Sequence, residues 1–154
     1  MVDYKEMREA DTFQIVDAIS TYHGKFNIQN MFADGTGGYS KGPCDVATDK
    51  GLDITGINFA QKAFDFNTYP NARTEMYLEL AKAVKQGFWV NDIVKEEMLA
   101  QAVTINGRGL QALVPKEDVK KVLGHSPDLC DAVALAVYAM NHTDPIPGKM
   151  SQKE

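Results

Sequence analysis

The chain contains only two cysteines, Cys44 and Cys130, which stand far apart and form no Cys-x-x-Cys spacing. This excludes a disulfide framework and fits a reducing compartment. No run of apolar residues is long enough to span a bilayer, and the polar N-terminus does not have the pattern of a signal peptide. We therefore expect a cytoplasmic protein that has no membrane partner.

The sequence has no excess of basic residues. The sequence has 16 Lys and Arg against 21 Asp and Glu, which gives a net charge of -5 and an isoelectric point near 5.2. This balance argues against a broad basic surface for passive nucleic-acid binding. It does not exclude a nuclease, because a nuclease concentrates acidic residues at its metal ions. With 154 residues, 44% of them hydrophobic, the chain is expected to form one domain of ordinary size.

The most informative stretch is an acidic start to an apolar helix. Ser126 is a candidate N-cap, and Pro127 suits the first helical position. Asp128 and Asp131 then share one helix face, because residues three apart are helical neighbours. Hard divalent cations prefer carboxylate oxygens, so this pair is a candidate metal site. The alternative is a first turn whose acids complement the helix dipole.

Strands and helices alternate along the first sixty residues. The pattern predicts strands at 2–7, 30–33 and 54–59, with helices at 11–24 and 43–50. Asp11 and Gln14 have the spacing of a capping box. This β-α-β-α-β order indicates an α/β protein with a largely parallel sheet.

Three helices and two strands follow in the second half. A helix capped by Asn71 and ended at Gly87 precedes a second helix at 93–102. Strands at 103–106 and 110–114 flank a Gly-Arg-Gly turn and predict a hairpin. The acidic helix runs to about residue 141, and the polar tail at 144–154 is expected to be loose.

A glycine-rich loop at 34–38 (Asp-Gly-Thr-Gly-Gly) follows the second predicted strand. A flexible strand-to-helix turn is one interpretation, and a phosphate loop is disfavoured because the Walker pattern is absent. In the sharper interpretation Asp34 is a third metal-binding carboxylate at the carboxyl end of a strand, where sites gather in α/β sheets. The glycines would let a metal ion or a DNA backbone approach closely.

Five segments occur in an order that resembles one family: 6–12 (EMREADT), 34–38 (DGTGG), 71–77 (NARTEMY), 114–121 (VPKEDVKK) and 126–132 (SPDLCDA). Together they resemble the C-terminal nuclease domain of a tailed-phage terminase large subunit. The resemblance covers residues 4–141 and leaves 142–154 as a polar C-terminal tail. It implies a ribonuclease H-like α/β fold in which helices flank a mixed sheet.

The resemblance also implies an activity, a cofactor and partners. The family uses Mg²⁺ or Mn²⁺ in a two-metal site to cleave concatemeric double-stranded DNA during packaging. By this resemblance Asp34 matches the family's second metal-binding acid and Asp131 an acid of its last helix, with Asp128 beside it, and these three are the expected catalytic and metal-binding residues. The implied partners are double-stranded DNA, the ATPase domain of the large subunit, the small terminase subunit and the portal, all in the bacterial host cytoplasm.

One departure from the family pattern affects the expected site. The family carries its first metal-binding Asp on a first, central strand, and no segment of this sequence supplies that residue. We therefore expect an N-terminally truncated fold with an incomplete metal site, and an open strand edge that favours association with another chain. Two alternatives to a terminase nuclease stay open: a non-catalytic remnant or interaction module, and a resolvase-like junction nuclease suggested by fold analogy.

Other charged and aromatic residues are weighed individually. Contacts to DNA phosphates are conceivable for four basic residues, but ordinary surface charge is the favoured interpretation for Arg108, Lys116, Lys120 and Lys121. His125 is expected at the surface, Glu75 to cap or pair within its own helix, and Trp89 in the core.

Overall fold

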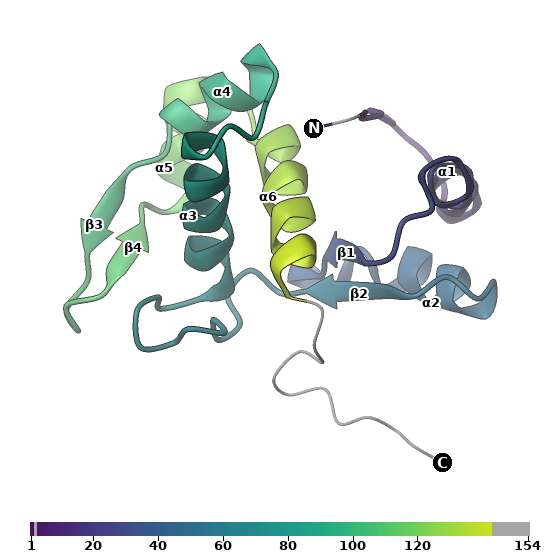
Figure 1. Ribbon diagram of the computed structural model, residues 1–154, viewed down its shortest axis with the longest axis horizontal. Coiled ribbons are helices and arrows are strands. Elements are labelled where there is room, and N and C mark those ends of the chain that lie inside the picture. Colours follow the sequence, from purple (N-terminus) through teal and green to yellow (C-terminus); the bar gives the residue numbers. More distant parts are fainter. Residues whose placement is uncertain (2, 143–154) are drawn as a thin grey trace.

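The computed structural model describes residue 1 and residues 3–142, so the predicted loose tail at 144–154 lies outside the described residues. Six α-helices, two short sheets and one 3₁₀ turn make up this part of the chain (Figure 1). In chain order the elements are α1 (Thr12–Phe26), β1 (Met31–Asp34), η1 (Thr36–Gly38), α2 (Lys41–Asp49), β2 (Ile54–Ile57), α3 (Ala72–Lys85), α4 (Asp92–Leu99), β3 (Val103–Ile105), β4 (Gln111–Leu113), α5 (Lys116–Leu123) and α6 (Asp128–Asn141).

Strands β1 and β2 form the predicted parallel pair, with Met31 opposite Ile54 and Asp34 opposite Ile57. Helix α2 connects them, as a parallel pair requires a crossover. Helices α1 and α2 cover one face of this sheet, where Met31 and Ile54 pack against the cluster of Val16, Ala47 and Leu52. The predicted capping box at Asp11 starts α1, so these local signals are confirmed.

Helix α6 covers the other face of the sheet. The ring of Phe32 lies edge-on to that of Tyr138, 6.1 Å between centroids, and the Asn30 side chain donates to the Ala139 carbonyl at 3.5 Å. Alternate residues of a strand point to opposite faces. Asp34 therefore shares the α6 side with Phe32, and the carboxyl end of β1 meets the start of α6.

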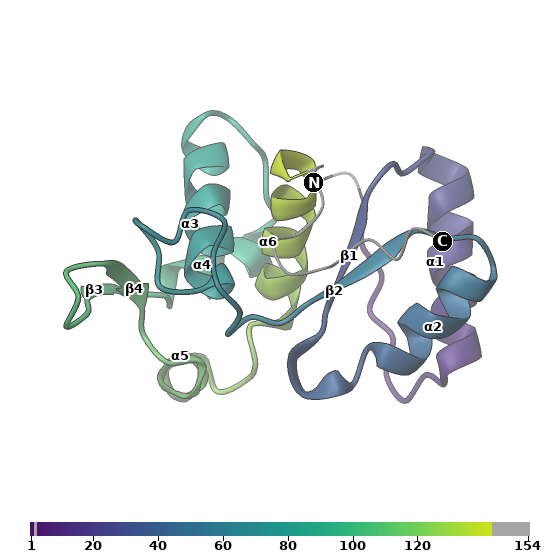
Figure 2. The same ribbon diagram turned by 90° about the horizontal axis from the view of Figure 1, so that it is seen from below.

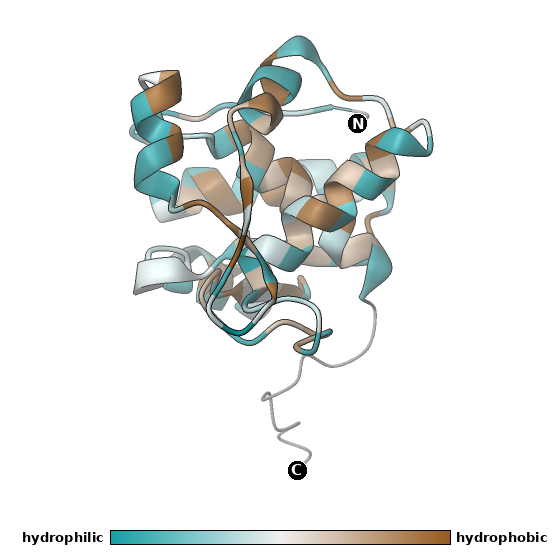
Figure 3. Ribbon diagram, turned by 90° about the vertical axis from the view of Figure 1, so that its left-hand side faces the viewer, coloured by the Kyte–Doolittle hydropathy of each residue, from teal (hydrophilic) through white to brown (hydrophobic). Residues whose placement is uncertain are grey.

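The main core surrounds α6, which lies between α3 and the β1–β2 sheet (Figure 2). Almost the whole of this helix is apolar, and Figure 3 shows hydrophobic segments on the central helices with hydrophilic turns outside. Its buried members include Cys130, Val133, Ala134, Val137 and Tyr138. A helix that is apolar nearly all round is expected at the centre of a domain. None of the described helices is long and apolar enough to cross a membrane.

The predicted strand at 2–7 is wrong, since residues 3–7 form no strand. This segment has exposed polar side chains and no apolar face to bury against the sheet. Its start is held instead by the Met1 ammonium group, which donates to the Trp89 carbonyl at 2.8 Å. In the described residues β1 pairs only with β2, so its other edge carries no strand. Association through that edge stays a prediction.

Two helix starts differ from the sequence prediction. Helix α5 was missed, although Pro115 precedes it, acids occupy its first turn and lysines its last turn. Ser126 is not the N-cap of α6, because Pro127 holds that position. The Ser126 hydroxyl instead donates to the Asp128 carboxylate at 2.5 Å.

Trp89 is also misplaced by the sequence analysis, which put it in the core. It lies in the α3–α4 connection with 65% of its surface exposed. Its neighbours Phe88 and Val90 pack against the core. Side chains alternate along an extended segment, so burying these two neighbours turns Trp89 to solvent.

Candidate metal centre

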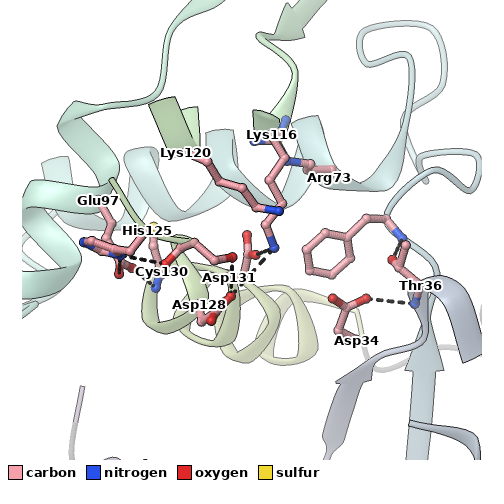
Figure 4. A network of polar contacts seen from close by, with 12 residues as sticks. Asp34, Thr36, Arg73, Glu97, Lys116, Lys120, His125, Asp128, Cys130 and Asp131 are labelled. Carbon is pink, nitrogen blue, oxygen red and sulfur yellow. Dashed lines mark hydrogen bonds and ion pairs between the residues drawn. The ribbon is translucent and has the colours of Figure 1, made fainter. Parts of the chain in front are cut away.

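Three acids line one groove between β1 and α6. Asp34 comes from the carboxyl end of β1, and Asp128 and Asp131 come from the first turn of α6 (Figure 4). The groove has a volume of about 350 Å³, and its walls are otherwise apolar: Phe32, Ala33, Ala132 and Leu135. The structure therefore places all three predicted metal ligands at one site.

The loop after β1 fixes the position of Asp34. Its carboxylate accepts the backbone N–H of Thr36 at 2.8 Å, and the Thr36 hydroxyl accepts the N–H of Phe59 at 3.1 Å. Gly35 lies so close to β2 that a Cβ there would come within 3.2 Å of the Gly56 backbone. A glycine is thus favoured beside Asp34, and the Gly35 N–H ties the loop to the end of β2 through the Ile57 carbonyl at 2.8 Å.

Asp131 is the buried acid of the site, with 5% of its surface exposed. One carboxylate oxygen, Oδ1, accepts the Tyr77 hydroxyl at 2.5 Å, and the other, Oδ2, lies 2.5 Å from the Lys116 ammonium nitrogen. Buried charges need such partners, because desolvation of an unpaired carboxylate is costly. The charge of Asp131 is therefore compensated by α3 and α5 together.

Asp128 is the exposed acid, with 81% of its side chain accessible. Its Oδ1 lies 3.9 Å from Lys116 and accepts the Ser126 hydroxyl. Lys116 thus bridges the two acids of α6 (Figure 4). The favoured sequence interpretation of Lys116 as ordinary surface charge is wrong, because its side chain is only 29% exposed and pairs with a buried carboxylate.

The three acids line one groove but are not in direct contact across it. In the described part of the chain, Asp34, Asp128 and Asp131 do not form a set of ligand atoms all within 4.8 Å of one another. Asp34 faces the two helix acids across the groove rather than touching them. The site can offer carboxylate oxygens to a cation from both walls, with a lysine ammonium already bound to one wall.

Burial shifts the pKa of two groups beneath the acids. Desolvation, together with the nearby Asp131 carboxylate, raises the pKa of Tyr77 far above its ordinary value. Desolvation likewise raises the pKa of the Cys130 thiol to about 12. Tyr77 therefore remains a protonated hydrogen-bond donor, and Cys130 remains a neutral thiol that packs as a small apolar residue.

Glu97 of α4 is a fourth acid near the start of α6, and sequence reasoning missed it. It is buried, and its Oε2 accepts the Cys130 N–H at 2.6 Å while Oε1 lies 3.8 Å from His125 Nδ1. It thereby supplies the hydrogen-bond acceptor at the helix N-terminus that the Ser126 hydroxyl does not supply. No local spacing could reveal this contact, since the partners are 33 residues apart. His125 is exposed, as predicted.

Desolvation is the largest effect on Glu97 and raises its pKa above the ordinary value of 4.5. A group with a raised folded pKa stabilises the fold below the unfolded pKa, and this contribution is lost as the pH rises through the folded pKa. Glu97→Gln should therefore gain stability relative to the wild type as the pH increases above about 4.5. Urea unfolding at several pH values measures this difference.

The matched variant Glu97→Ala separates charge from hydrogen bonding. Both variants lack the charge, but only Gln keeps an oxygen that can accept the Cys130 N–H. Glu97→Ala should be less stable than Glu97→Gln by about 1–2 kcal/mol at every pH. Equal stability of the two variants would contradict the capping role of Glu97.

The remaining basic candidates lie at the surface. Lys120 and Lys121 pair with Glu117 and Asp118 in their own helix, at 3.0 and 2.7 Å. Arg108 lies exposed in the β3–β4 turn. These positions agree with ordinary surface charge, and their contact with DNA stays a prediction.

Glu75 does not cap or pair within its own helix, so that expectation is wrong. It is buried, and it accepts the N–H groups of Phe64 and Asp65 at 2.7 and 2.8 Å and the Tyr138 hydroxyl at 2.8 Å. With Glu79 and His142 it forms a group that could hold a metal ion. Glu79 already bonds His142 at 2.8 Å and the Asn141 side chain at 2.9 Å. We assign these contacts to packing of the end of α6 against α3.

Solved structures of one domain share this fold. A point mutant of the nuclease domain of the large terminase subunit gp2 of bacterial virus Sf6, with manganese, is 20% identical; the match covers 82% of this chain and 72% of that chain at a TM-score of 0.63. The nuclease domain of the same subunit and a mutant with calcium each give 20% identity, 82% and 71% coverage and a TM-score of 0.62. No family model and no curated protein matches the sequence.

These matches confirm the predicted fold. The chain has the ribonuclease H-like α/β fold of a terminase nuclease domain, although the sequences are only 20% identical. Fold alone does not assign an activity, so the function must be argued from the acids of the groove.

Proposed function

We propose that this chain is the metal-dependent endonuclease domain, residues 4–141, of a DNA-packaging terminase large subunit. The observation that carries the proposal is the convergence of Asp34, Asp128 and Asp131 on one groove. That groove lies in a chain with the fold of a nuclease domain that was solved with manganese. The proposed reaction is hydrolysis of phosphodiester bonds in concatemeric double-stranded DNA.

The residues present fit a hard divalent cation. Carboxylate oxygens are the ligands that Mg²⁺ and Mn²⁺ prefer, and Asp34, Asp128 and Asp131 are the residues that would hold such ions. The ammonium group of Lys116, 2.5 Å from Asp131, shows that this wall of the groove accepts a positive charge. When bound, a pair of such ions supplies Lewis acidity toward the phosphate and lowers the pKa of an attacking water.

The chain's own residues perform the remaining tasks. Asp34 enters from β1 on a loop held by Thr36, so its carboxylate has a fixed position. Asp131 enters from the opposite wall with its orientation set by two partners. Lys116 neutralises the α6 acids, and its partly exposed side chain is long enough to leave them when a cation binds. The proposed partners are double-stranded DNA, the ATPase domain of a large subunit, a small terminase subunit and a portal, in a bacterial host cytoplasm.

Plasmid cleavage tests the proposal. With Mn²⁺ or Mg²⁺, the chain is expected to convert supercoiled plasmid to nicked and linear forms. Asp34→Asn should lower the rate about 100-fold or more, because even outer partners of metal ligands cost 10–100-fold when removed. Asp45→Asn is the matched control, since Asp45 is an exposed acid of α2 and does not line the groove. Cleavage that survives Asp34→Asn would contradict the site assignment.

One observation favours a second candidate, a non-catalytic interaction module with the same fold. The three acids do not form a compact ligand set among the described residues, and both oxygens of Asp131 already have partners. A folded chain that binds no Mn²⁺ and leaves plasmid intact would support this candidate. A resolvase-like nuclease would instead cut four-way junctions in preference to linear duplex.

A further inference from the structure

A buried tyrosine links α3 to the metal-binding acid of α6. Tyr77 has 4% of its surface exposed, and its hydroxyl donates to Asp131 Oδ1 at 2.5 Å across a sequence separation of 54 residues. Asp131 Oδ2 is turned the other way, toward Lys116 and the exposed acid Asp128. The two carboxylate oxygens therefore differ: Oδ1 bonds the buried Tyr77, whereas Oδ2 pairs with the partly exposed Lys116, which also approaches Asp128.

We propose that Tyr77 is a positioning residue for the metal centre, which holds Asp131 with Oδ2 presented to the bound cation. A phenol O–H is a neutral donor, so it fixes the carboxylate without cancelling its charge. Lys116 differs in this respect, because its ammonium adds a positive charge that a metal ion must compete with. Tyr77 can keep its hydrogen bond to Oδ1 while Lys116 is exchanged for a metal ion at Oδ2.

The environment of Tyr77 fixes the ring as well as the hydroxyl. The guanidinium carbon of Arg73 lies 5.4 Å from the ring centroid. Arg73 is itself bound at both ends of the β3–β4 hairpin, to the Val114 carbonyl at 2.8 Å and the Gln101 side chain at 3.0 Å. A stacked, doubly anchored arginine leaves the ring little freedom to turn. The orientation of Asp131 thus depends on packing between α3 and the base of the hairpin.

The chain provides a matched control for this role. Tyr138 is also fully buried, and its hydroxyl donates to a buried carboxylate, Glu75, at 2.8 Å. Glu75 does not line the groove. Loss of either hydroxyl removes one charge-assisted hydrogen bond from the interior, but only Tyr77 acts on an acid of the site.

The test is Mn²⁺ binding to the full chain, measured by calorimetry for the wild type, Tyr77→Phe and Tyr138→Phe. We expect Tyr77→Phe to raise the dissociation constant for Mn²⁺ by about 10- to 100-fold, the range for outer partners of metal ligands. Tyr138→Phe should bind Mn²⁺ as the wild type does. Unchanged binding by Tyr77→Phe, or equal weakening by both variants, would overturn the inference.

A double-mutant cycle tests whether Tyr77 acts through Asp131. In the metal-free chain, Tyr77→Phe should reduce the equilibrium constant for folding about tenfold in the wild-type background and have little effect on it in an Asp131→Ala background. Additive effects of the two substitutions would overturn the inference. The proposal rests on the proposed function, yet the two fail differently: a wild type that binds no Mn²⁺ overturns both, whereas normal binding by Tyr77→Phe overturns only the role of Tyr77.

Discussion

Asp131→Asn should reduce Mn²⁺-dependent cleavage about 100-fold or more, whereas Asp128→Asn should reduce it about tenfold or less. Asp131 is buried and held at both oxygens, so it offers a metal ion a fixed anionic ligand. Asp128 is 81% exposed and fixed mainly by Ser126, so solvent competes for its oxygens. Initial rates of plasmid nicking at saturating Mn²⁺ measure the two effects.

The ranking of the two acids is the decisive part of this result. Asparagine has nearly the shape of aspartate and keeps one oxygen, so the substitutions test charge rather than volume. Thermal unfolding of each variant is the control for folding, since Asp131→Asn also leaves Lys116 without its strongest partner. A larger loss for Asp128→Asn than for Asp131→Asn would show that the exposed wall of the groove holds the metal.

Local sequence patterns paired the two acids of the last helix, and the family resemblance added Asp34 to them. Helical spacing puts Asp128 and Asp131 on one face, and the alternation along β1 puts Asp34 on the same side of the sheet as Phe32. The parallel pairing of β1 and β2 followed from the short α-helical crossover between them. The position of the last helix against this face of the sheet, and with it the groove, is seen only in the structure.

The partners of these acids were not predictable, because they depend on tertiary packing. Tyr77 and Glu97 contact the start of α6 from other helices, and they lie 54 and 33 residues away in the sequence from the residues they bond. Lys116 was interpreted as a surface lysine because ordinary surface charge is the commoner role of a basic residue, and α5 was not recognised as a helix. Once Pro115 sets the start of α5, the first side chain of that helix lies beside Asp131.

The failed strand at 2–7 illustrates a different limit. Residues 3–7 have too few apolar side chains to form a buried face. The prediction from residue spacing did not take this into account. The same reasoning explains Trp89, which was assigned to the core because it is large and aromatic. Its exposure follows from the burial of both neighbours, and a preference for residue type cannot detect such an alternation.

Lys116→Ala is the second substitution with a large expected effect. It should lower the stability of the metal-free chain and raise its affinity for Mn²⁺. The metal-free chain should lose about 1–2 kcal/mol of unfolding free energy, because a buried carboxylate loses its ion pair and the lysine was partly exposed. Mn²⁺ should bind about tenfold more tightly, because the competing ammonium group is gone. Two unit charges 4 Å apart interact by about 4 kcal/mol at an effective dielectric constant near 20. In the wild type the flexible lysine avoids most of this repulsion by moving away from the bound ion.

Thermal unfolding with and without Mn²⁺ measures both effects in one experiment, since a bound ion stabilises the folded state by an amount that grows with the logarithm of its affinity. The matched control is Lys120→Ala, one turn further along α5, where the lysine pairs at 3.0 Å with the exposed Glu117. That variant should change neither the metal-free stability nor the stabilisation by Mn²⁺ appreciably, because exposed pairs contribute little. If Lys116→Ala instead weakens Mn²⁺ binding, the ammonium group does not compete with the metal ion but supports its site, and the assignment of Lys116 as the group displaced from Asp131 is wrong.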